Sequence, residues 1–430
     1  MAIEKAPSPT TIDHKPHAAF FRQSGWLMGS TILSGLMAFG VHPLAKSIPE
    51  AEYSIFGTML MVTACIPTIP LQMMFAQQTA RTLATDRTRQ LVGLIRLGWL
   101  WTLILWAIAA IIVFLFKDSI MASWKLTTAN TLWVTLAAVL MNLWMPLFSG
   151  VLQGRQDFFW LGWATILGGV GRVIVAIVAV QVFHAGATGM MFGALVGLGA
   201  WAMIAIWRSR DLWTGPSEPF DGRGLVKQVL PLFLAFGACQ FLFTTDTMYT
   251  KAFFPGEQLA PYVAAGTLSR ALLWVVLPLA SVMFPKIVHA TAKSEKSNLL
   301  GIVLLGTAGL AICGAAGLYV LGPYVVKIVY TPQYVAETVR LLPWYAGAMI
   351  PLALANALVN DLMGRGRFKI VPLMVALVVA YGFTMPVMLR HYPGRLEIPL
   401  QTLGAFNLVL LMICVCFSFG SSAFRVQGSK

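Results

Sequence analysis

The chain has 430 residues, of which 58% are hydrophobic and only 11% are charged, and its formal net charge is +14. This balance is far too apolar for a soluble domain of ordinary composition, so most of the chain must lie in lipid. The positive charges are spread over short stretches between apolar runs, which favours membrane topology over nucleic-acid binding as their explanation.

Apolar runs recur along the whole chain. A membrane-spanning helix needs roughly 20 apolar residues, and runs of this kind alternate with short charged or Pro/Gly-rich stretches. The polar, Pro-containing first 20 or so residues do not resemble a cleavable signal. We predict an all-α membrane protein of about twelve spans, at residues 24–45, 53–76, 94–116, 127–150, 160–182, 186–207, 228–248, 259–284, 299–321, 336–358, 370–390 and 397–419.

The distribution of Lys and Arg predicts the orientation, because cytoplasmic loops carry the excess of these residues. With the N-terminus inside, 20 of the 30 Lys and Arg residues fall on inner segments and 7 fall on outer loops. Both termini are therefore predicted to be cytoplasmic.

Three sequence matches relate the first six spans to the last six. They pair residues 69–98 with 277–306, 53–58 with 262–267 and 152–158 with 362–368, at offsets of 208 to 210. Because each half has six spans, both halves insert with the same orientation around an axis along the membrane normal. We predict a cytoplasmic tail, an N-terminal lobe, a cytoplasmic linker, a C-terminal lobe and a second cytoplasmic tail, at residues 1–23, 24–207, 208–227, 228–419 and 420–430, with a binding cavity between the lobes.

Two prolines occupy matched positions in spans two and eight. Pro70 and Pro278 each lack the backbone N–H that would complete a helix, so each bends its span and frees a carbonyl. We predict that both are hinges without ligand contact.

Two arginines lie at bilayer depth, where an ionisable side chain is costly and usually faces a cavity or a partner. Arg172 is in the middle of span five beside a stripe of small residues, and Arg270 is in span eight. Neither has an obvious neighbouring charge in the sequence. Both are candidate substrate-binding residues, with satisfied structural pairing as the alternative.

Span seven carries polar residues at helical spacing on one face, which is expected to meet water and to lead to the outer surface. These candidate substrate-binding residues are Gln240, Thr244, Thr247 and Lys251. Asp246 falls about 120° from this face, so it either pairs with Arg270 on the neighbouring span or takes part in ion coupling.

The remaining candidates for substrate binding are weaker. Arg22 lies at the inner mouth of span one and Arg81 just beyond span two, where snorkelling to the interface is the alternative. The sequence contains no G-x-x-x-x-G-K-[ST] phosphate loop, catalytic triad, carboxylate pair or metal-ligand cluster. It therefore predicts neither catalysis nor a metal site.

Local sequence patterns point to a known superfamily. They are LAKSIPEAEYSIFGTML, LFSGVLQGRQDFFW and TTDTMYTKAFFPGEQLAPYVAAGTLSRALLWVVLPLASVMFPKIV. With these patterns and twelve spans in like-oriented halves, the chain resembles the multidrug/oligosaccharidyl-lipid/polysaccharide exporter superfamily. Within it, the chain resembles the bacterial oligosaccharide flippases of polysaccharide biosynthesis.

The resemblance implies an alternating-access flippase of the bacterial inner membrane. It would carry an undecaprenyl-diphosphate-linked oligosaccharide from the cytoplasmic to the periplasmic leaflet, with Arg172 and Arg270 suited to the diphosphate because guanidinium binds phosphate bidentately. An ion gradient or the membrane potential would supply energy, without a cofactor. Expected partners are the lipid-linked oligosaccharide and membrane lipids, with a polysaccharide polymerase and glycosyltransferases as candidate protein partners and no nucleic acid.

Three alternatives remain open at this stage. A cation-coupled multidrug exporter of the same fold would need buried carboxylates, and spans one to six carry no mid-span Asp or Glu. The lipid II flippase branch typically has helices beyond twelve. A membrane-embedded glycan polymerase or ligase is disfavoured by the short outer loops.

Overall fold

The computed structural model describes residues 15–220, 222–271 and 299–426. In these ranges the chain forms helices and short turns without a β-strand, which confirms the predicted all-α class. Eleven of the described helical segments are long and apolar enough to cross a membrane. The predicted span at 259–284 is helical over its described part, 259–271, within a helix that begins at residue 256, and its remainder lies outside the described residues.

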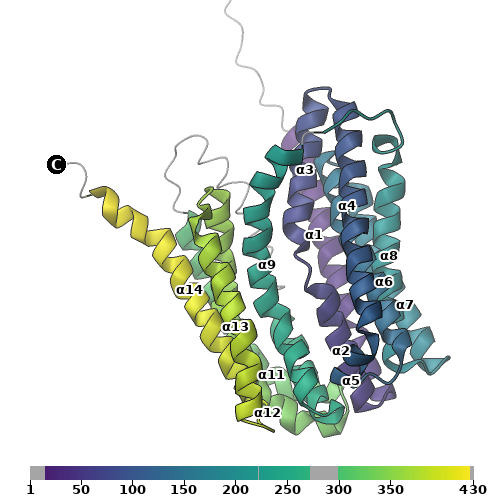
Figure 1. Ribbon diagram of the computed structural model, residues 1–430, viewed down its shortest axis with the longest axis vertical. Coiled ribbons are helices and arrows are strands. Elements are labelled where there is room, and N and C mark those ends of the chain that lie inside the picture. The colour runs from purple at the N-terminus through teal and green to yellow at the C-terminus, as the bar shows by residue number, and fades with distance from the viewer. Residues whose placement is uncertain (1–14, 221, 272–298, 427–430) are drawn as a thin grey trace, which may run out of the picture.

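The first helical bundle contains the N-terminal half of the chain. Its elements are α1 Lys15–Phe39, η1 His42–Ser47, α2 Glu50–Ala64, α3 Thr68–Ala84, α4 Thr88–Leu115, α5 Lys117–Ser123, α6 Ala129–Gly154, α7 Phe158–Gln181 and α8 Gly186–Arg208 (Figure 1). Helices α7 and α8 pack so closely that a side chain at Gly197 would not fit. A Cβ added there would lie 2.6 Å from the Gly168 carbonyl oxygen. Small residues thus bring the two helix backbones together, as is common in membrane bundles.

The second helical bundle contains the C-terminal half. Its elements are α9 Gly222–Phe253, the helix at 256–271, α11 Leu299–Val329, α12 Pro332–Gly364, η3 Phe368–Ile370, α13 Val371–His391 and α14 Glu397–Val426. Helix α12 contacts α9, α11 and α14 and is the central helix of this bundle. The Asn407 side chain of α14 donates a hydrogen bond of 2.8 Å to the Ala348 carbonyl of α12, which fixes these helices to each other inside the apolar core.

Each bundle has two ends, which are named here by their elements. The linker end is the end at which α8 continues into residues 209–220 and α9 begins, and the α5 end is the opposite one, at the bottom of Figure 1. At the linker end, α6 stops at Gly154 and α12 stops at Gly364, which are matched positions of the sequence repeat.

The predicted second span, 53–76, is not one continuous helix but is interrupted between α2 and α3. Pro67 lies in the interruption and has no N–H to donate to the Thr63 carbonyl four residues earlier. The Asn142 side chain of α6 takes the place of that donor, at 2.8 Å from the Thr63 oxygen. Pro70, at which the sequence led us to expect the bend, lies in the first turn of α3, where proline is well tolerated.

The segment between the bundles is bound to the first bundle. The Arg96 guanidinium donates to the carbonyls of Trp213 and Gly215, each at 2.9 Å. Arg155 forms an ion pair with Asp211 at 2.8 Å. The connection is shorter than the predicted linker at 208–227, because α8 includes Arg208 and α9 already begins at Gly222.

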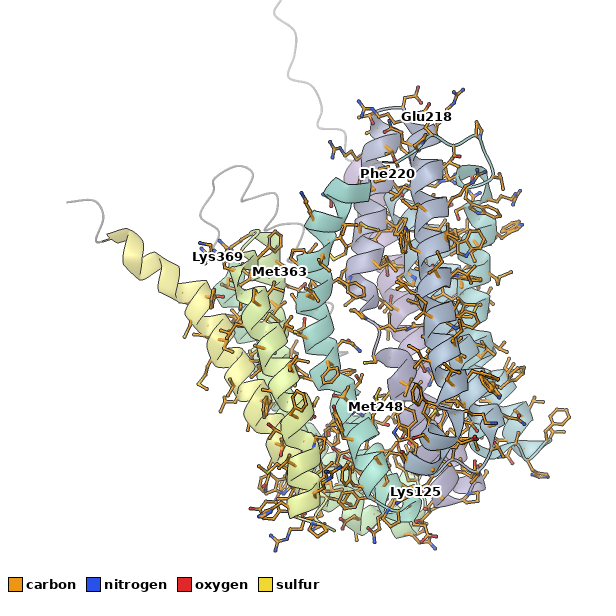
Figure 2. All side chains as sticks on the ribbon, in the orientation of Figure 1. Lys125, Glu218, Phe220, Met248, Met363 and Lys369 are labelled. Carbon is orange, nitrogen blue, oxygen red and sulfur yellow. The ribbon has the colours of Figure 1, made fainter. Side chains whose placement is uncertain are left out.

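Gly93 of α4 should be needed for the linker to pack against the first bundle. A Cβ added to Gly93 would lie 2.2 Å from the Glu218 carbonyl oxygen, which belongs to the linker backbone (Figure 2 labels Glu218). We expect Gly93→Ala to destabilise the protein by about 1–3 kcal/mol through this clash. The variant should melt at a lower temperature in detergent and be cut faster by trypsin after the exposed Arg210.

Gly29→Ala is the matched control, because nothing lies within 4 Å of a Cβ added to Gly29 in α1. This control should melt at or slightly above the temperature of the unaltered protein, since alanine favours the helix. Equal melting and cleavage of the two variants would show that the linker does not need Gly93.

Candidate functional site

The two bundles are joined by hydrogen bonds in only one half of their length, as far as the described residues show. These hydrogen bonds lie between the middle of the bundles and the α5 end. They join Gln240 to Ala64, Lys251 to Ser54, Tyr53 to Tyr330, Lys125 to Phe254, and Lys46 to Lys327 and Ile328. Figure 2 shows Lys125 near the α5 end, with Glu218 and Phe220 at the linker end. The bundles are therefore closed against each other at the α5 end.

The polar face of α9 lies in this contact instead of meeting water as predicted. The Gln240 amide donates at 2.5 Å to the Ala64 carbonyl, which the interruption after α2 has freed. The Lys251 ammonium donates at 2.8 Å to the Ser54 hydroxyl of α2, and the lysine is only 1% exposed. Thr244 and Thr247 are also fully buried. In this conformation α2 contacts Gln240 and Lys251 of the predicted water-facing stripe, whereas Thr247 bonds to Arg270 inside the second bundle.

Arg270 is paired inside the second bundle. Its guanidinium donates to the Asp246 carboxylate at 2.7 Å, to the Thr247 hydroxyl at 2.9 Å and to the Phe243 carbonyl at 2.9 Å. Arg270 is 3% exposed and Asp246 is 0% exposed. The structure thus contains the Asp246–Arg270 pair that the helical-wheel angle suggested, and it leaves Arg270 without the free guanidinium expected of a substrate-binding residue.

Two tyrosines complete this buried cluster. The hydroxyls of Tyr262 and Tyr345 both donate to the second oxygen of the Asp246 carboxylate, the former at 2.8 Å. The carboxylate therefore has an ionic partner and several donors, which is what a buried charge requires. The cluster holds the helix at 256–271 against α9 and α12.

Arg172 has the opposite environment inside the first bundle. Its Nε is buried and has no hydrogen-bond partner among the described residues, and the guanidinium forms no ion pair with any of them. Gly193 of α8 packs on the Arg172 main chain, since an added Cβ would lie 2.6 Å from the Arg172 oxygen. His42 of η1 lies close enough to interact with Arg172 electrostatically, and a histidine supplies no negative charge. Among the described residues, Arg172 thus has neither an ionic partner nor an acceptor for its Nε.

The other candidates lie away from both arginines or outside the described structure. Arg81 is exposed in the last turn of α3 at the linker end. Arg22 lies in α1, with its side chain outside the described part, and Pro278 also lies outside the described residues. Sequence reasoning did not single out Tyr330 or Lys125, because a tyrosine or lysine at the end of a span is typical of the membrane interface.

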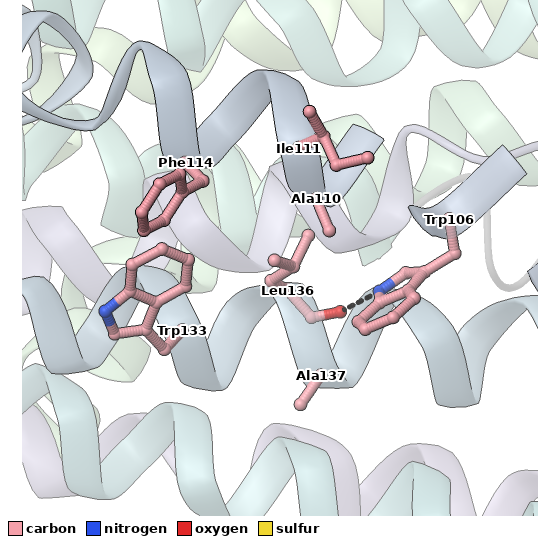
Figure 3. A pocket seen from close by; sticks show the side chains of 7 residues that line it. All are labelled: Trp106, Ala110, Ile111, Phe114, Trp133, Leu136 and Ala137. Carbon is pink, nitrogen blue, oxygen red and sulfur yellow. Dashed lines mark hydrogen bonds between the residues drawn. The ribbon is translucent and has the colours of Figure 1, made fainter. Parts of the chain in front are cut away.

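An apolar groove lies on the first bundle between α4 and α6. Figure 3 shows that Phe114 and Trp133 stand at one side of this groove and Trp106 at the other, with Leu136 between them. The Trp106 indole N–H is satisfied by the Leu136 carbonyl at 2.8 Å. The groove therefore offers no polar group to a charged headgroup and is suited to hydrocarbon contact.

The sequence matches the family model of the lipid II flippase MurJ over residues 30–422. A comparison with curated proteins gave no match. The sequence alone favours the oligosaccharide branch because of its helix count, whereas the family model that matches is that of the lipid II flippases.

Several solved structures share the fold. An inward-facing multidrug resistance MATE family transporter of the MOP superfamily has a TM-score of 0.73 at 14% identity, covering 93% of this chain and 96% of the other. A MOP superfamily transporter from Pyrococcus furiosus, described as having a binding pocket of reverse polarity, has a TM-score of 0.68 at 14% identity, covering 98% and 100%. The lipid II flippase MurJ in an inward closed conformation has a TM-score of 0.66 at 14% identity, covering 92% and 87%.

At these identities the structural likeness shows the fold alone. The family-model match over residues 30–422 confirms the predicted superfamily. The family match extends over much more than half of the chain. The protein therefore belongs to the lipid II flippase MurJ family and is a multi-pass membrane flippase for a lipid-linked substrate, not an enzyme.

Proposed function

We propose that this flippase carries an undecaprenyl-diphosphate-linked oligosaccharide from the cytoplasmic to the periplasmic leaflet of the bacterial inner membrane, for surface polysaccharide assembly. Both termini would lie in the cytoplasm, which makes the α5 end periplasmic. The observation that carries the anionic part of the proposal is the buried Nε of the Arg172 guanidinium, which has no acceptor among the described residues.

A buried cation without a counter-charge is unfavourable, so a ligand that brings negative charge gains binding energy from it. A diphosphate suits this position because each phosphate presents oxygens that guanidinium can bind in pairs. Two acidic residues of the first bundle, Glu52 and Asp157, have partners of their own. Glu52 accepts hydrogen bonds from the Thr127 hydroxyl at 2.7 Å and the Ala187 N–H at 2.8 Å, and Asp157 pairs with Arg208 at 2.8 Å. An organic cation would find no free carboxylate among these groups.

Alternating access is supported by the kind of contact that joins the bundles. The interface buries Thr244 and Lys251 and partly buries Gln240, and water can also satisfy these side chains. An interface that never opened would gain more from apolar residues, because burying polar groups gives little net stability. With the α5 end periplasmic, the closed contact lies on the periplasmic side and the bundle ends nearer the cytoplasm are free of inter-bundle hydrogen bonds among the described residues.

The energy source that we propose is an ion gradient or the membrane potential, since the sequence has no phosphate-binding loop for ATP. Cytoplasmic glycosyltransferases would supply the glycan, because it must be complete before it is moved across the membrane. A periplasmic polymerase would consume it after it has been moved.

The test is transport by the purified protein in liposomes. Fluorescent polyprenyl-diphosphate oligosaccharide should move between leaflets faster than in protein-free liposomes, as measured by the fraction accessible to an added quencher. Lipid II and a cationic dye serve as comparison substrates. If only lipid II moved, lipid II and not the oligosaccharide would be the substrate. If only the dye moved, the proposal of an anionic substrate would be wrong.

A further inference from the structure

A chain of hydrogen-bonded aromatic side chains crosses from one bundle to the other at the α5 end. The Tyr53 hydroxyl of α2 donates at 3.1 Å to the Tyr330 hydroxyl of the second bundle. His42 Nδ1 lies 2.8 Å from the Tyr53 hydroxyl. Because the Tyr53 proton points to Tyr330, the His42 nitrogen is the donor in the second contact. The rings of Tyr330 and Tyr334 stack at 5.9 Å, so the acceptor tyrosine is held in place.

Three lysines surround this chain, and each reaches across the interface to a neutral acceptor. The Lys46 ammonium donates to the Ile328 carbonyl at 2.6 Å. The Lys125 ammonium donates to the Phe254 carbonyl at 3.0 Å. As described above, Lys251 donates to a serine hydroxyl. Separation of the bundles would return each ammonium to water, which offsets the lost hydrogen bond.

The ion pairs, unlike these hydrogen bonds, do not cross between the bundles in the part of the chain that the structure describes. Among the described residues, every ion pair lies within one bundle or joins the linker to the first bundle, and none joins the two bundles. Breaking a buried ion pair is costly, whereas a hydrogen bond to an uncharged acceptor can be exchanged for one to water at little cost. Each bundle is thus held as a unit, and the contact between them is of the kind that can open and close.

Close backbone contact seals the same end. A Cβ added to Gly57 of α2 would lie 2.1 Å from Val263 Cγ1 of the second bundle. A Cβ added to Gly256 would lie 2.9 Å from the Ala51 Cα. Tyr53, Val263 and Tyr330 are all buried in this contact. Water is therefore excluded while the hydrogen bonds hold.

We propose that the hydrogen bond between Tyr53 and Tyr330 is the latch of a gate at the α5 end, and that its strength sets the ratio of molecules closed and open there. The three interfacial lysines support the closed state. The inference rests on the alternating access proposed above, and it identifies the residues that stabilise the closed state.

The test measures how easily the sealed contact becomes accessible. The five native cysteines are first replaced, and Val263→Cys then places one thiol in the seal. A membrane-impermeant maleimide is added from the α5 side, and its labelling rate is measured for Tyr53→Phe and Tyr330→Phe. Each substitution keeps the ring and removes one hydroxyl. Tyr381→Phe is the matched control, because Tyr381 is buried wholly inside the second bundle against Phe241 and Phe406.

We expect the thiol to react slowly in the parent and roughly two- to tenfold faster in each latch variant, the range that corresponds to one net hydrogen bond. The double variant Tyr53→Phe/Tyr330→Phe should be little faster than either single variant, because both remove the same bond between the bundles. The His42–Tyr53 contact that Tyr53→Phe also removes lies within the first bundle. Unchanged labelling in both latch variants, or equal acceleration by Tyr381→Phe, would overturn the proposal. Labelling needs no substrate, so it tests the latch even if the oligosaccharide is not transported.

Discussion

Arg270→Ala should greatly reduce the amount of folded protein. The change leaves the Asp246 carboxylate, which is 0% exposed, without its ionic partner at 2.7 Å. Removing one partner of a buried ion pair costs about 3–5 kcal/mol, a large share of the roughly 5–15 kcal/mol by which proteins are stable. The measurement is the yield of monodisperse protein in detergent and its melting temperature. The tyrosines that donate to Asp246 do not replace a positive charge.

The double variant Asp246→Asn/Arg270→Gln is the control for this result. It removes both charges while keeping groups that can accept from Tyr262 and Tyr345 and donate to the Phe243 carbonyl. It should therefore melt at a higher temperature than Arg270→Ala alone. If Arg270→Ala instead folded normally and lost transport, the guanidinium would be a substrate-binding group and the structural role argued here would be wrong.

Arg172→Ala should leave the protein folded but reduce transport, in contrast to Arg270→Ala. Its guanidinium has no partner among the described residues, so its loss should leave the melting temperature unchanged or raise it. Transport of the diphosphate-linked oligosaccharide should fall by about tenfold or more, since hydrogen bonds between charged groups contribute roughly 1.5–3 kcal/mol each. Arg172→Lys keeps the charge but not the paired donors, and we expect intermediate transport. Initial rates in liposomes measure this.

Arg340→Ala is the matched control for the loss of a positive charge. Arg340 is half-exposed at the α5 end and pairs with Glu337 and Glu397, a type of surface interaction that contributes about 0–1 kcal/mol. Its removal should change transport little. If Arg172→Ala transported the oligosaccharide at the normal rate, the diphosphate would have to be bound elsewhere.

Features that depend on the local sequence could be predicted. The spans follow from runs of apolar residues, because lipid demands a helix of about 20 such residues wherever the chain crosses. Eleven of the predicted spans correspond to described helical segments that are long and apolar enough to cross a membrane, and one of these segments is interrupted between α2 and α3. The Asp246–Arg270 pair could also be anticipated, because the two residues are only 24 positions apart on consecutive helices.

Other features depended on contacts between distant segments. The interruption of the second span had a signal in the two prolines after Cys65, but its position depended on a donor from α6 for the Thr63 carbonyl, 79 residues away. Periodicity correctly placed Gln240 and Lys251 on one face of α9, yet it could not show what covers that face. The Gln240 contact with Ala64 spans 176 residues.

The sequence by itself therefore determined the all-α membrane fold, the repeat and the set of intramembrane cations. Only the tertiary structure decided which cation is free, because Arg270 meets an acid and Arg172 meets none among the described residues. It also decided that the polar face of α9 is covered at the α5 end. The physical reason is that hydropathy and helical period are properties of one segment, whereas a counter-charge or a covering helix is supplied by another.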